Sequence, residues 1–492
     1  MTKQTDKGKT MRKQADLTQG GIGKTILRFS LPILFSYLLQ TLYTVADAAI
    51  CGYTLSGNEV AGVNDTNPLS FLFLQFAIGC TSGMSVLVAD SAGKRDNEEL
   101  RKAFAAQIVL GGAIAVLLTA VGLFSVKPLL RLLGVTKGGN ETSREVYRAA
   151  FSYISVICGG IAAQFFYNMI CCVLRSIGDS LTPLLFLLCS TLLNIALDLL
   201  FILACGWGVA GAAAATVLSQ ALAAIGCFVF AFARYPFLRL HGRDFRAISG
   251  RLCLRTLWQG VPLGLQFSVL AFGIIVMQNG VIAFDKTPDG GMVAGTPAQI
   301  GYSAACKLGN LFMTPYNALG TAMLSFCGQN YGAQKNDRIR KGVIQSLFML
   351  LVITAFDIVA GLLLCIGGAY QHIFLASSKI TAQSVRFGNL YLYTALPFYV
   401  FLGAIFLLRN IVQGMGKPLF PFLAGIAELV ARVGACLLLP RLVNGGAITS
   451  AASSASFVAL CFADPIAWLA ADILLVIATV FYVRRNTRDL PS

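Results

Sequence analysis

The chain has 492 residues, of which 56% are hydrophobic and only 12% are charged, and its mean hydropathy is +0.73. This composition excludes an ordinary soluble protein. Lys and Arg (38) outnumber Asp and Glu (22), which gives a net charge of +16. Because the basic residues lie in short segments between apolar runs, they indicate anionic membrane lipids as partners rather than nucleic acid.

Long apolar runs follow one another along the whole chain, and each can carry a helix through a hydrocarbon core of about 30 Å. The first run follows a Lys-rich tail, but it is too long for a signal peptide and contains Asp47, so we interpret it as an uncleaved helix. The sequence predicts an all-α polytopic membrane protein with twelve transmembrane helices, at residues 26–53, 59–90, 103–126, 147–172, 181–204, 208–233, 256–284, 299–329, 343–368, 387–412, 418–440 and 458–483.

Basic residues are distributed unevenly between the two sides of the predicted membrane. The N-terminal tail, the even-numbered loops and the C-terminal end together hold 27 Lys and Arg residues, whereas the odd-numbered loops hold nine. Five of those nine lie in one loop, from Lys127 to Arg148. Since loops rich in Lys and Arg stay in the cytoplasm, both termini are predicted to be cytoplasmic.

The two halves of the chain resemble each other. Residues 93–102 align with 332–341 at an offset of 239, and residues 174–183 align with 412–421 at an offset of 238. This repeat predicts two pseudo-symmetric six-helix bundles with the same orientation in the membrane. The expected organisation is a cytoplasmic tail (1–25), an N-lobe (26–233), a basic cytoplasmic linker (234–255), a C-lobe (256–483) and a second cytoplasmic tail (484–492).

Cysteine and histidine argue against enzyme chemistry. The 14 Cys are scattered without a C-x-x-C motif, and only two His are present. Neither a histidine metal site nor a Ser-His-Asp triad is therefore expected. The segment Gly20–Thr25 resembles the end of a phosphate-binding loop, but Thr18 stands where that motif needs Gly, and no strand precedes it. We therefore expect no enzyme and no cofactor, and transport energy would come from an ion gradient or a partner.

Intramembrane carboxylates are costly, so each one is a functional candidate. Asp47, Asp198 and Thr216 are predicted at a common depth of about 9 to 12 Å from the outer ends of three different spans, with Tyr43 and Asn194 one turn deeper. Two carboxylates with amide and hydroxyl oxygens suit a proton or a small hard cation. The alternative is that these groups only hydrogen-bond neighbouring helices together.

The second half of the chain has a different set of charges. Glu428 and Arg432 are four residues apart in one span, so they are expected to neutralise each other as a structural pair. Asp357 has no evident partner, and its role stays open. Spans seven and ten contain no central carboxylate.

Several motifs resemble those of the multidrug and toxic compound extrusion (MATE) transporters, in the same order and over nearly the whole chain. They are Leu17-Thr-Gln-Gly20, Leu31-Pro32, Tyr43-Thr-Val-Ala-Asp47 with Gly52, Asn194 with Asp198, residues 208–212, Gly328-Gln-Asn-Tyr-Gly-Ala333 and Gln413-Gly-Met-Gly416. The resemblance implies a V-shaped, two-lobed antiporter that expels organic, often cationic and aromatic compounds in exchange for H⁺ or Na⁺.

The resemblance also implies roles for single residues. The cation or proton site of the family corresponds to Asp47, Asn194, Asp198 and Thr216 in this sequence, and these residues would also bind Na⁺ if transport is sodium-coupled. The substrate-facing surface of the family corresponds to Gln40, Tyr43 and Asn168. Because spans seven and ten lack acidic residues, the chain looks more like the N-lobe-coupled, DinF-like branch of the family.

The function expected from the sequence is therefore a multidrug efflux antiporter of the bacterial cytoplasmic membrane, acting as a monomer on small organic molecules. One alternative is an exporter of a lipid-linked precursor or another metabolite, which would need a strongly basic cavity, whereas the predicted interior is nearly free of Arg and Lys. A membrane-embedded enzyme would need a catalytic constellation that the sequence does not show. A channel is disfavoured by the tandem repeat with buried carboxylates. The choice between H⁺ and Na⁺ and the identity of the substrate stay open.

Overall fold

The computed structural model describes residues 16–133, 135–136, 138 and 140–488. The expected terminal tails lie partly outside this range, since residues 1–15 and 489–492 are not among the described residues. The first half of the described chain forms α1 (Ile22–Thr54), α2 (Gly57–Asp65), α3 (Asn67–Lys94), α4 (Asn97–Leu132), α5 (Glu141–Gly159), α6 (Ile161–Ser176), α7 (Leu181–Leu199), a π-helical turn (Leu200–Ala204) and α8 (Gly208–Arg234).

A connecting segment with a 3-10 turn (Pro236–Leu238) and α9 (Gly242–Arg246) leads into the second half. That half forms α10 (Gly250–Ala283), α11 (Pro297–Gly332), α12 (Asn336–Cys365), α13 (Ala369–Phe374), α14 (Ala382–Ala395), α15 (Tyr399–Gly414), α16 (Leu419–Asn444), α17 (Ser454–Cys461) and α18 (Ala463–Arg488), with 3-10 turns at Ile366–Gly368, Ser377–Lys379 and Leu396–Phe398. The all-α prediction is confirmed.

The number of membrane-crossing helices agrees with the twelve spans predicted from the sequence once the burial of α11 is considered. Within the described chain, ten helical segments are long and apolar enough to cross a membrane, and the bent pair of α5 and α6 makes an eleventh. The twelfth predicted span, residues 299–329, corresponds to α11. This helix is more polar because it packs against α1, α3, α14 and α15, so protein rather than lipid covers much of its surface.

Several predicted spans are built from two helices instead of one. The run at 59–90 breaks at Thr66, where Pro68 starts α3, and the run at 147–172 bends by 45° between α5 and α6. The run at 387–412 is interrupted by the turn Leu396–Phe398, whose Pro397 has no N–H to continue the helix. Hydropathy detects the apolar length of a span but not these interruptions.

The internal repeat is visible in the helix boundaries. α3 ends at Lys94 and α11 at Gly332, while α6 ends at Ser176 and α15 at Gly414. α7 begins at Leu181 and α16 at Leu419, so all three pairs have the offset of 238 seen in the sequence. The prediction of two pseudo-symmetric bundles is confirmed.

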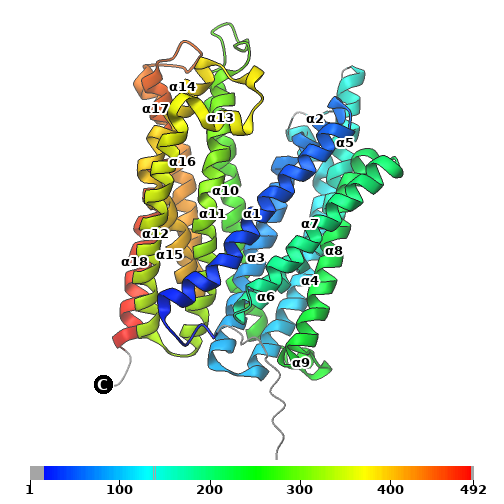
Figure 1. The fold of residues 1–492 in the computed structure, drawn as a ribbon, viewed down its shortest axis with the longest axis vertical. Coiled ribbons are helices and arrows are strands. Elements are labelled where there is room, and N and C mark those ends of the chain that lie inside the picture. Colours follow the sequence, from blue (N-terminus) through cyan, green and yellow to red (C-terminus); the bar gives the residue numbers. More distant parts are fainter. Residues whose placement is uncertain (1–15, 134, 137, 139, 489–492) are drawn as a thin grey trace, which may run out of the picture.

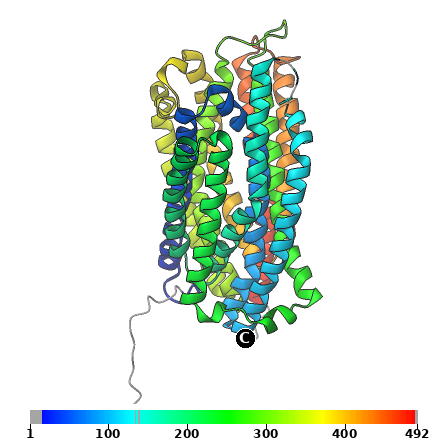
Figure 2. The same ribbon diagram turned by 90° about the vertical axis from the view of Figure 1, so that its right-hand side faces the viewer.

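The two lobes form a V (Figure 1). They meet at the end where the described chain begins and ends, and they diverge toward the opposite end. After a rotation by 90°, the N-lobe lies in front of the C-lobe, with the helices of both running in the same general direction (Figure 2).

Reciprocal glycine contacts close the V at its narrow end. A Cβ on Gly93 of α3 would collide with the carbonyl oxygen of Gln329, and a Cβ on Gly332 of α11 would collide with that of Asp90. The two contacts are related by the repeat, because each residue of one pair lies 239 positions from its counterpart in the other. Glycine is needed at both positions because the backbones of α3 and α11 approach too closely for any side chain.

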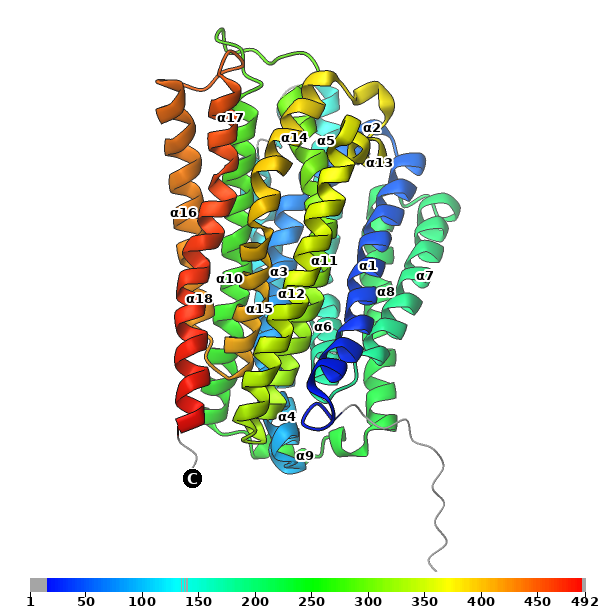
Figure 3. The ribbon, with the colours of Figure 1, turned by 60° about the vertical axis from the view of Figure 1, so that its left-hand side comes forward.

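Helix α1 contacts both lobes. α1 packs against α11 and α12 of the C-lobe near its beginning, and against α7 and α8 of the N-lobe further along (Figure 3). The hydroxyl groups of Tyr37 in α1 and Thr321 in α11 lie 3.1 Å apart. α1 therefore carries Asp47 into the N-lobe while it stays in contact with the C-lobe.

Candidate functional site

Three helices of the N-lobe bring the expected ion-site residues together. Asp47 lies on α1, Asp198 on α7 and Thr216 on α8. The carboxyl groups of Asp47 and Asp198 lie close enough to act on each other, and the Tyr43 hydroxyl donates to Oγ1 of Thr216 over 3.3 Å. We call this group, with Asn194, the N-lobe site.

The acidic end of the N-lobe site is buried and incompletely hydrogen-bonded. Asp198 and Asn194 are both 0% exposed and share one face of α7, because they are four residues apart. Five polar atoms of this site have no hydrogen-bond partner among the described residues. They are both carboxylate oxygens of Asp198, both polar side-chain atoms of Asn194 and Oδ1 of Asp47. Buried polar groups normally have partners, so this arrangement fits a proton or a cation.

The helix that carries Asp198 changes its geometry directly after this residue. α7 ends at Leu199 and continues as the π-helical turn Leu200–Ala204, in which the amide of Cys205 donates to the carbonyl of Leu200. Such turns occur frequently at functional sites because they displace side chains from their regular helical positions. The sequence predicted one continuous span at 181–204 and did not indicate this turn.

One aromatic residue of the N-lobe site was missed by sequence reasoning. Tyr153 of α5 lies close enough to Asp47, Asp198 and Tyr43 for their charges to act on it, and it packs beside Cys51. A tyrosine in an amphipathic helix carries no signal that distinguishes it from ordinary core packing. Only the bend between α5 and α6 and the approach of α1 place it here.

The donor set can be compared with the needs of the two coupling ions. No group of three or more His, Cys, Asp or Glu side chains that could hold a metal ion occurs in the described part of the chain. A bound Na⁺ would therefore rely on the two carboxylates together with the oxygens of Asn194 and Thr216, which are hard ligands of the kind that such a cation accepts. A proton needs only the carboxyl pair.

The three expected substrate-facing residues are not gathered at one point. Tyr43 belongs to the N-lobe site through Thr216. Gln40 lies exposed on α1, two turns before Asp47. Asn168 is half-buried on α6, where its Nδ2 donates to the carbonyl of Gln164.

The interpretation of Glu428 and Arg432 as an isolated pair was incomplete. Arg432 Nη2 donates to Glu428 over 3.0 Å, but Glu428 also accepts from Arg409 Nη2 over 3.3 Å. Arg432 Nε lies 3.0 Å from Asp464, whose other oxygen accepts from Tyr391 over 2.8 Å. Together with Asp472, on which the charges of Arg409 and Glu428 act, these side chains form what we call the C-lobe charge network.

Sequence reasoning missed most of this network, although a signal was present. Asp464 and Asp472 are carboxylates inside the last predicted span, and the criterion that selected Asp47 applies to them equally. Arg409, near the end of the predicted span at 387–412, is only 2% exposed within α15. The expectation of an interior nearly free of Arg was therefore wrong for the C-lobe, where both arginines are ion-paired.

Asp357, whose role was left open, lies apart from this network. It is 1% exposed on α12 and lies beside Tyr316 of α11. The Tyr316 hydroxyl donates to Thr354 of α12 over 3.0 Å. These contacts connect α11 to α12 within the C-lobe.

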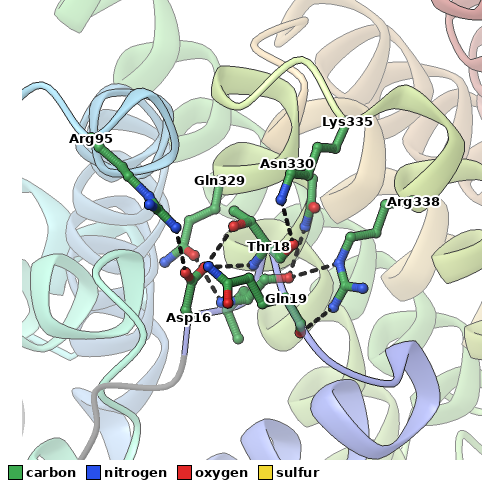
Figure 4. Close-up of polar contacts among 9 residues, drawn as sticks. Asp16, Thr18, Gln19, Arg95, Gln329, Asn330, Lys335 and Arg338 are labelled. Carbon is green, nitrogen blue, oxygen red and sulfur yellow. Dashed lines mark hydrogen bonds and ion pairs between the residues drawn. The ribbon is translucent and has the colours of Figure 1, made fainter.

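At the narrow end of the V, the residues before α1 bind to both lobes (Figure 4). Asp16 pairs with Arg95 of the N-lobe over 3.0 Å. Arg338 of α12 donates to the carbonyl oxygens of Leu17, Gln19 and Gly20 over 3.1, 2.6 and 2.7 Å. Although partial burial opposes it, hydrogen bonds from Thr18 and the Arg95 guanidinium hold the pKa of Asp16 below its usual range. We call residues 16–20 the N-terminal strap.

The side chain of Gln329 adds a second connection at this end. Its Oε1 accepts from the amide of Leu17 over 3.2 Å, and its Nε2 donates to the carbonyl of Ser176 over 2.7 Å. Gln329 lies on α11 and Ser176 ends α6, so one side chain connects the C-lobe, the N-lobe and the N-terminal strap. Leu17 is 0% exposed in this position.

A two-lobed bundle of membrane-spanning helices with two neighbouring carboxyl groups inside one lobe defines a class of membrane transporter. A family model described as MatE matches residues 32–200 and 292–438, which is more than half of the chain. The protein belongs to the MATE family of membrane transporters and is not an enzyme.

Relatives match most of the chain. The probable multidrug resistance protein YpnP of Bacillus subtilis is 29% identical over 411 residues, which cover 83% of this chain and 86% of that protein. The FAD transporter of Shewanella oneidensis is 24% identical over 444 residues, which cover 89% of this chain and 91% of that protein. A solved structure of an outward-facing multidrug resistance MATE family transporter matches with a TM-score of 0.82 at 22% identity, covering 98% of this chain and 100% of that one. This last likeness shows the fold.

Proposed function

We propose that this protein is a secondary antiporter that exports organic, often cationic and aromatic compounds in exchange for H⁺ or Na⁺. The observation that carries the proposal is the proximity of Asp47 and Asp198, two carboxyl groups on different helices of one lobe that act on each other. The name of the Bacillus subtilis relative, a probable multidrug resistance protein, supports the substrate class.

Electrostatics gives the carboxyl pair its role. Two carboxylates in a low-dielectric site repel each other strongly, so a proton or a cation bound between them stabilises the contact. Loss of that ion favours separation of α1 from α7. Because α1 also contacts α11, such a movement would alter the contact between the lobes and connect ion binding to alternating access.

The substrate would bind on the side of the N-lobe site that faces the C-lobe. We assign Gln40, Tyr43 and Asn168 to this surface. Tyr43 would join the two sites, since its ring offers an aromatic face to a cationic substrate while its hydroxyl bonds Thr216. The protein would act as a monomer in the bacterial cytoplasmic membrane with both termini in the cytoplasm, so the V in Figure 1 would open outward.

The proposal is tested in proteoliposomes with a fluorescent lipophilic cation. A pH gradient and a Na⁺ gradient are imposed separately, and we expect one of them to drive transport. Asp47→Asn and Asp198→Asn should abolish this transport while the melting temperature stays near that of the wild type, because each change leaves a single carboxyl that cannot hold the ion in the same way. Asp65→Asn, which changes an exposed carboxylate at the end of α2, is the matched control.

Transport that neither gradient drives, or that both N-lobe variants retain, would contradict the antiporter proposal. The alternative is export of a lipid-linked precursor or another anionic metabolite. One observation favours it: Arg175, in the last turn of α6, lies near Tyr37 of α1 and Tyr167, and its Nε has no hydrogen-bond partner among the described residues. Transport of an anionic dinucleotide, but of no lipophilic cation, by the wild-type protein in proteoliposomes would support this alternative.

A further inference from the structure

The C-lobe charge network contains more acids than bases. Its members are Arg409, Glu428, Arg432, Asp464 and Asp472, which come from α15, α16 and α18. Each of the five residues is at most 7% exposed. With all five ionised, the network carries one uncompensated negative charge inside a membrane-spanning lobe. Such a charge is expensive in a low-dielectric environment, so a bound proton is the simplest compensation.

The hydrogen bonds of the network show where that proton belongs. Glu428 accepts from both arginines, and Asp464 is held by Arg432 and the hydroxyl of Tyr391. Asp472 differs from these two acids. It is 5% exposed, and neither of its carboxylate oxygens has a hydrogen-bond partner among the described residues.

We propose that Asp472 is a proton-binding site of the C-lobe, separate from the carboxyl pair of the N-lobe. The proton on Asp472 makes the network neutral and leaves the ion pairs of Glu428 and Asp464 intact. A metal cation is a poorer occupant, because the positive charge of Arg409 acts on Asp472. The proposal does not depend on the antiporter function.

The groups that face Asp472 support this assignment. Arg409 from α15 and Glu428 from α16 act on it directly. The neighbouring α12 contributes Asp357, which lies beside Tyr316, and α17 contributes Cys461, which lies near Asp464. Asp464 itself is eight residues away on α18, about 12 Å along the helix. Among the described residues, Arg409 is thus the cationic side chain that acts on Asp472. Arg409 also forms an ion pair with Glu428.

Infrared spectroscopy of the purified protein tests the proposal without substrate or gradient. A protonated carboxyl group gives a C=O stretching band that a carboxylate lacks. At neutral pH we expect Asp472→Asn to remove one such band, whereas Asp65→Asn, which changes an exposed carboxylate outside the network, should retain it. Asp472→Glu should shift the band instead of removing it, which provides a second test if the Asn variant fails to fold.

The melting temperature separates the proton site from an ordinary ion-paired carboxylate. Asn has the shape and charge of a protonated Asp, so Asp472→Asn should melt close to the wild type at neutral pH, while Glu428→Gln should melt lower because it breaks contacts with two arginines. Unchanged carboxyl bands in Asp472→Asn would show that Asp472 is ionised and overturn the proposal. Because no transport is measured, this outcome is distinguishable from failure of the antiporter proposal.

Discussion

Asp47 and Asp198 bring two carboxyl groups into contact in the N-lobe, and within the described chain neither forms an ion pair with Lys or Arg. In the C-lobe, by contrast, Arg409 and Arg432 compensate most of the buried negative charge. A carboxyl pair without a basic partner changes its charge whenever an ion binds or leaves, whereas ion pairs with Arg persist over the physiological pH range. This contrast between single residues is why we place the coupling ion of transport in the N-lobe.

The hydrogen bond between Tyr43 and Thr216 connects α1 to α8 in the N-lobe site, which makes it suitable for a double-mutant cycle. Tyr43→Phe and Thr216→Val should each lower the stability in detergent, and the double variant should lose less than the sum of the two. The expected coupling is about 0.6 kcal/mol, typical of hydrogen bonds between membrane helices. Thermal unfolding of all four proteins measures it, and strictly additive losses would show that the bond contributes nothing.

At the scale of single elements, the basic segment between the lobes is attached to the N-lobe by one acidic residue. Asp244 of α9 accepts from the amide of His241 over 2.7 Å and lies 3.4 Å from Nε of Arg101 in α4. Although burial opposes it, these contacts hold the pKa of Asp244 below its usual range. An otherwise basic crossover is thereby fixed to the first turns of α4.

The pKa of Asp244 predicts how this attachment depends on pH. A carboxyl whose pKa is lower in the folded than in the unfolded protein stabilises the fold above the unfolded value of about 3.9, and this contribution is lost as the pH falls through the folded pKa. Asp244→Asn should therefore cost about 1 kcal/mol at pH 7, seen as a lower melting temperature, and the difference should disappear as the pH falls below the folded pKa of Asp244. Asp289→Asn, an exposed carboxylate in the loop before α11, is the matched control and should show neither effect.

At the scale of the whole molecule, the narrow end of the V is closed by two features: direct backbone contact of α3 with α11 and the N-terminal strap. The contact requires glycine at positions 93 and 332. The strap binds Arg95 on the N-lobe and Arg338 on the C-lobe. The contact between α3 and α11 must break if the protein is to open at this end, and the N-terminal strap must release at least one lobe.

Gly332→Val tests the backbone contact. The new side chain would collide with Asp90, so α3 and α11 must move apart and the narrow end should open. Hydrogen exchange measured by mass spectrometry should then be faster at the adjoining ends of α3 and α11 than in the wild type. Gly446→Val, at a glycine with no atom within 4 Å of an added Cβ, is the control. Equal exchange in all three proteins would mean that this contact does not hold the lobes together.

Arg338→Gln tests the strap. The change removes most of three hydrogen bonds to Leu17, Gln19 and Gly20, worth about 2 kcal/mol in total, so exchange of residues 16–20 should accelerate by roughly 30-fold. Arg340→Gln alters an exposed arginine of the same helix and should leave this exchange unchanged. A strap that exchanges at the wild-type rate in Arg338→Gln would show that these bonds do not anchor it.

The sequence by itself determined the membrane class, the twelve spans and the two-fold repeat, because apolar length and repeated motifs are local properties that survive in any packing. It also indicated that Asp47, Asp198 and Thr216 lie at one depth, since the rise per residue of a helix converts sequence distance into height. That the carboxyl groups of Asp47 and Asp198 meet depended on how α1 crosses from one lobe to the other.

Only the tertiary structure decided which buried charges are compensated. Glu428 and Arg432 form a pair by spacing alone, but Arg409 and Asp464 join them from other helices through ion pairs between residues up to 32 positions apart. Asp472 joins them through the charges of Arg409 and Glu428 that act on it. The approach of Tyr153 to the N-lobe site and the binding of residues 16–20 to both lobes have the same origin. Contacts between segments distant in the chain depend on helix tilt, bends and rotation, which packing sets and which hydropathy does not record.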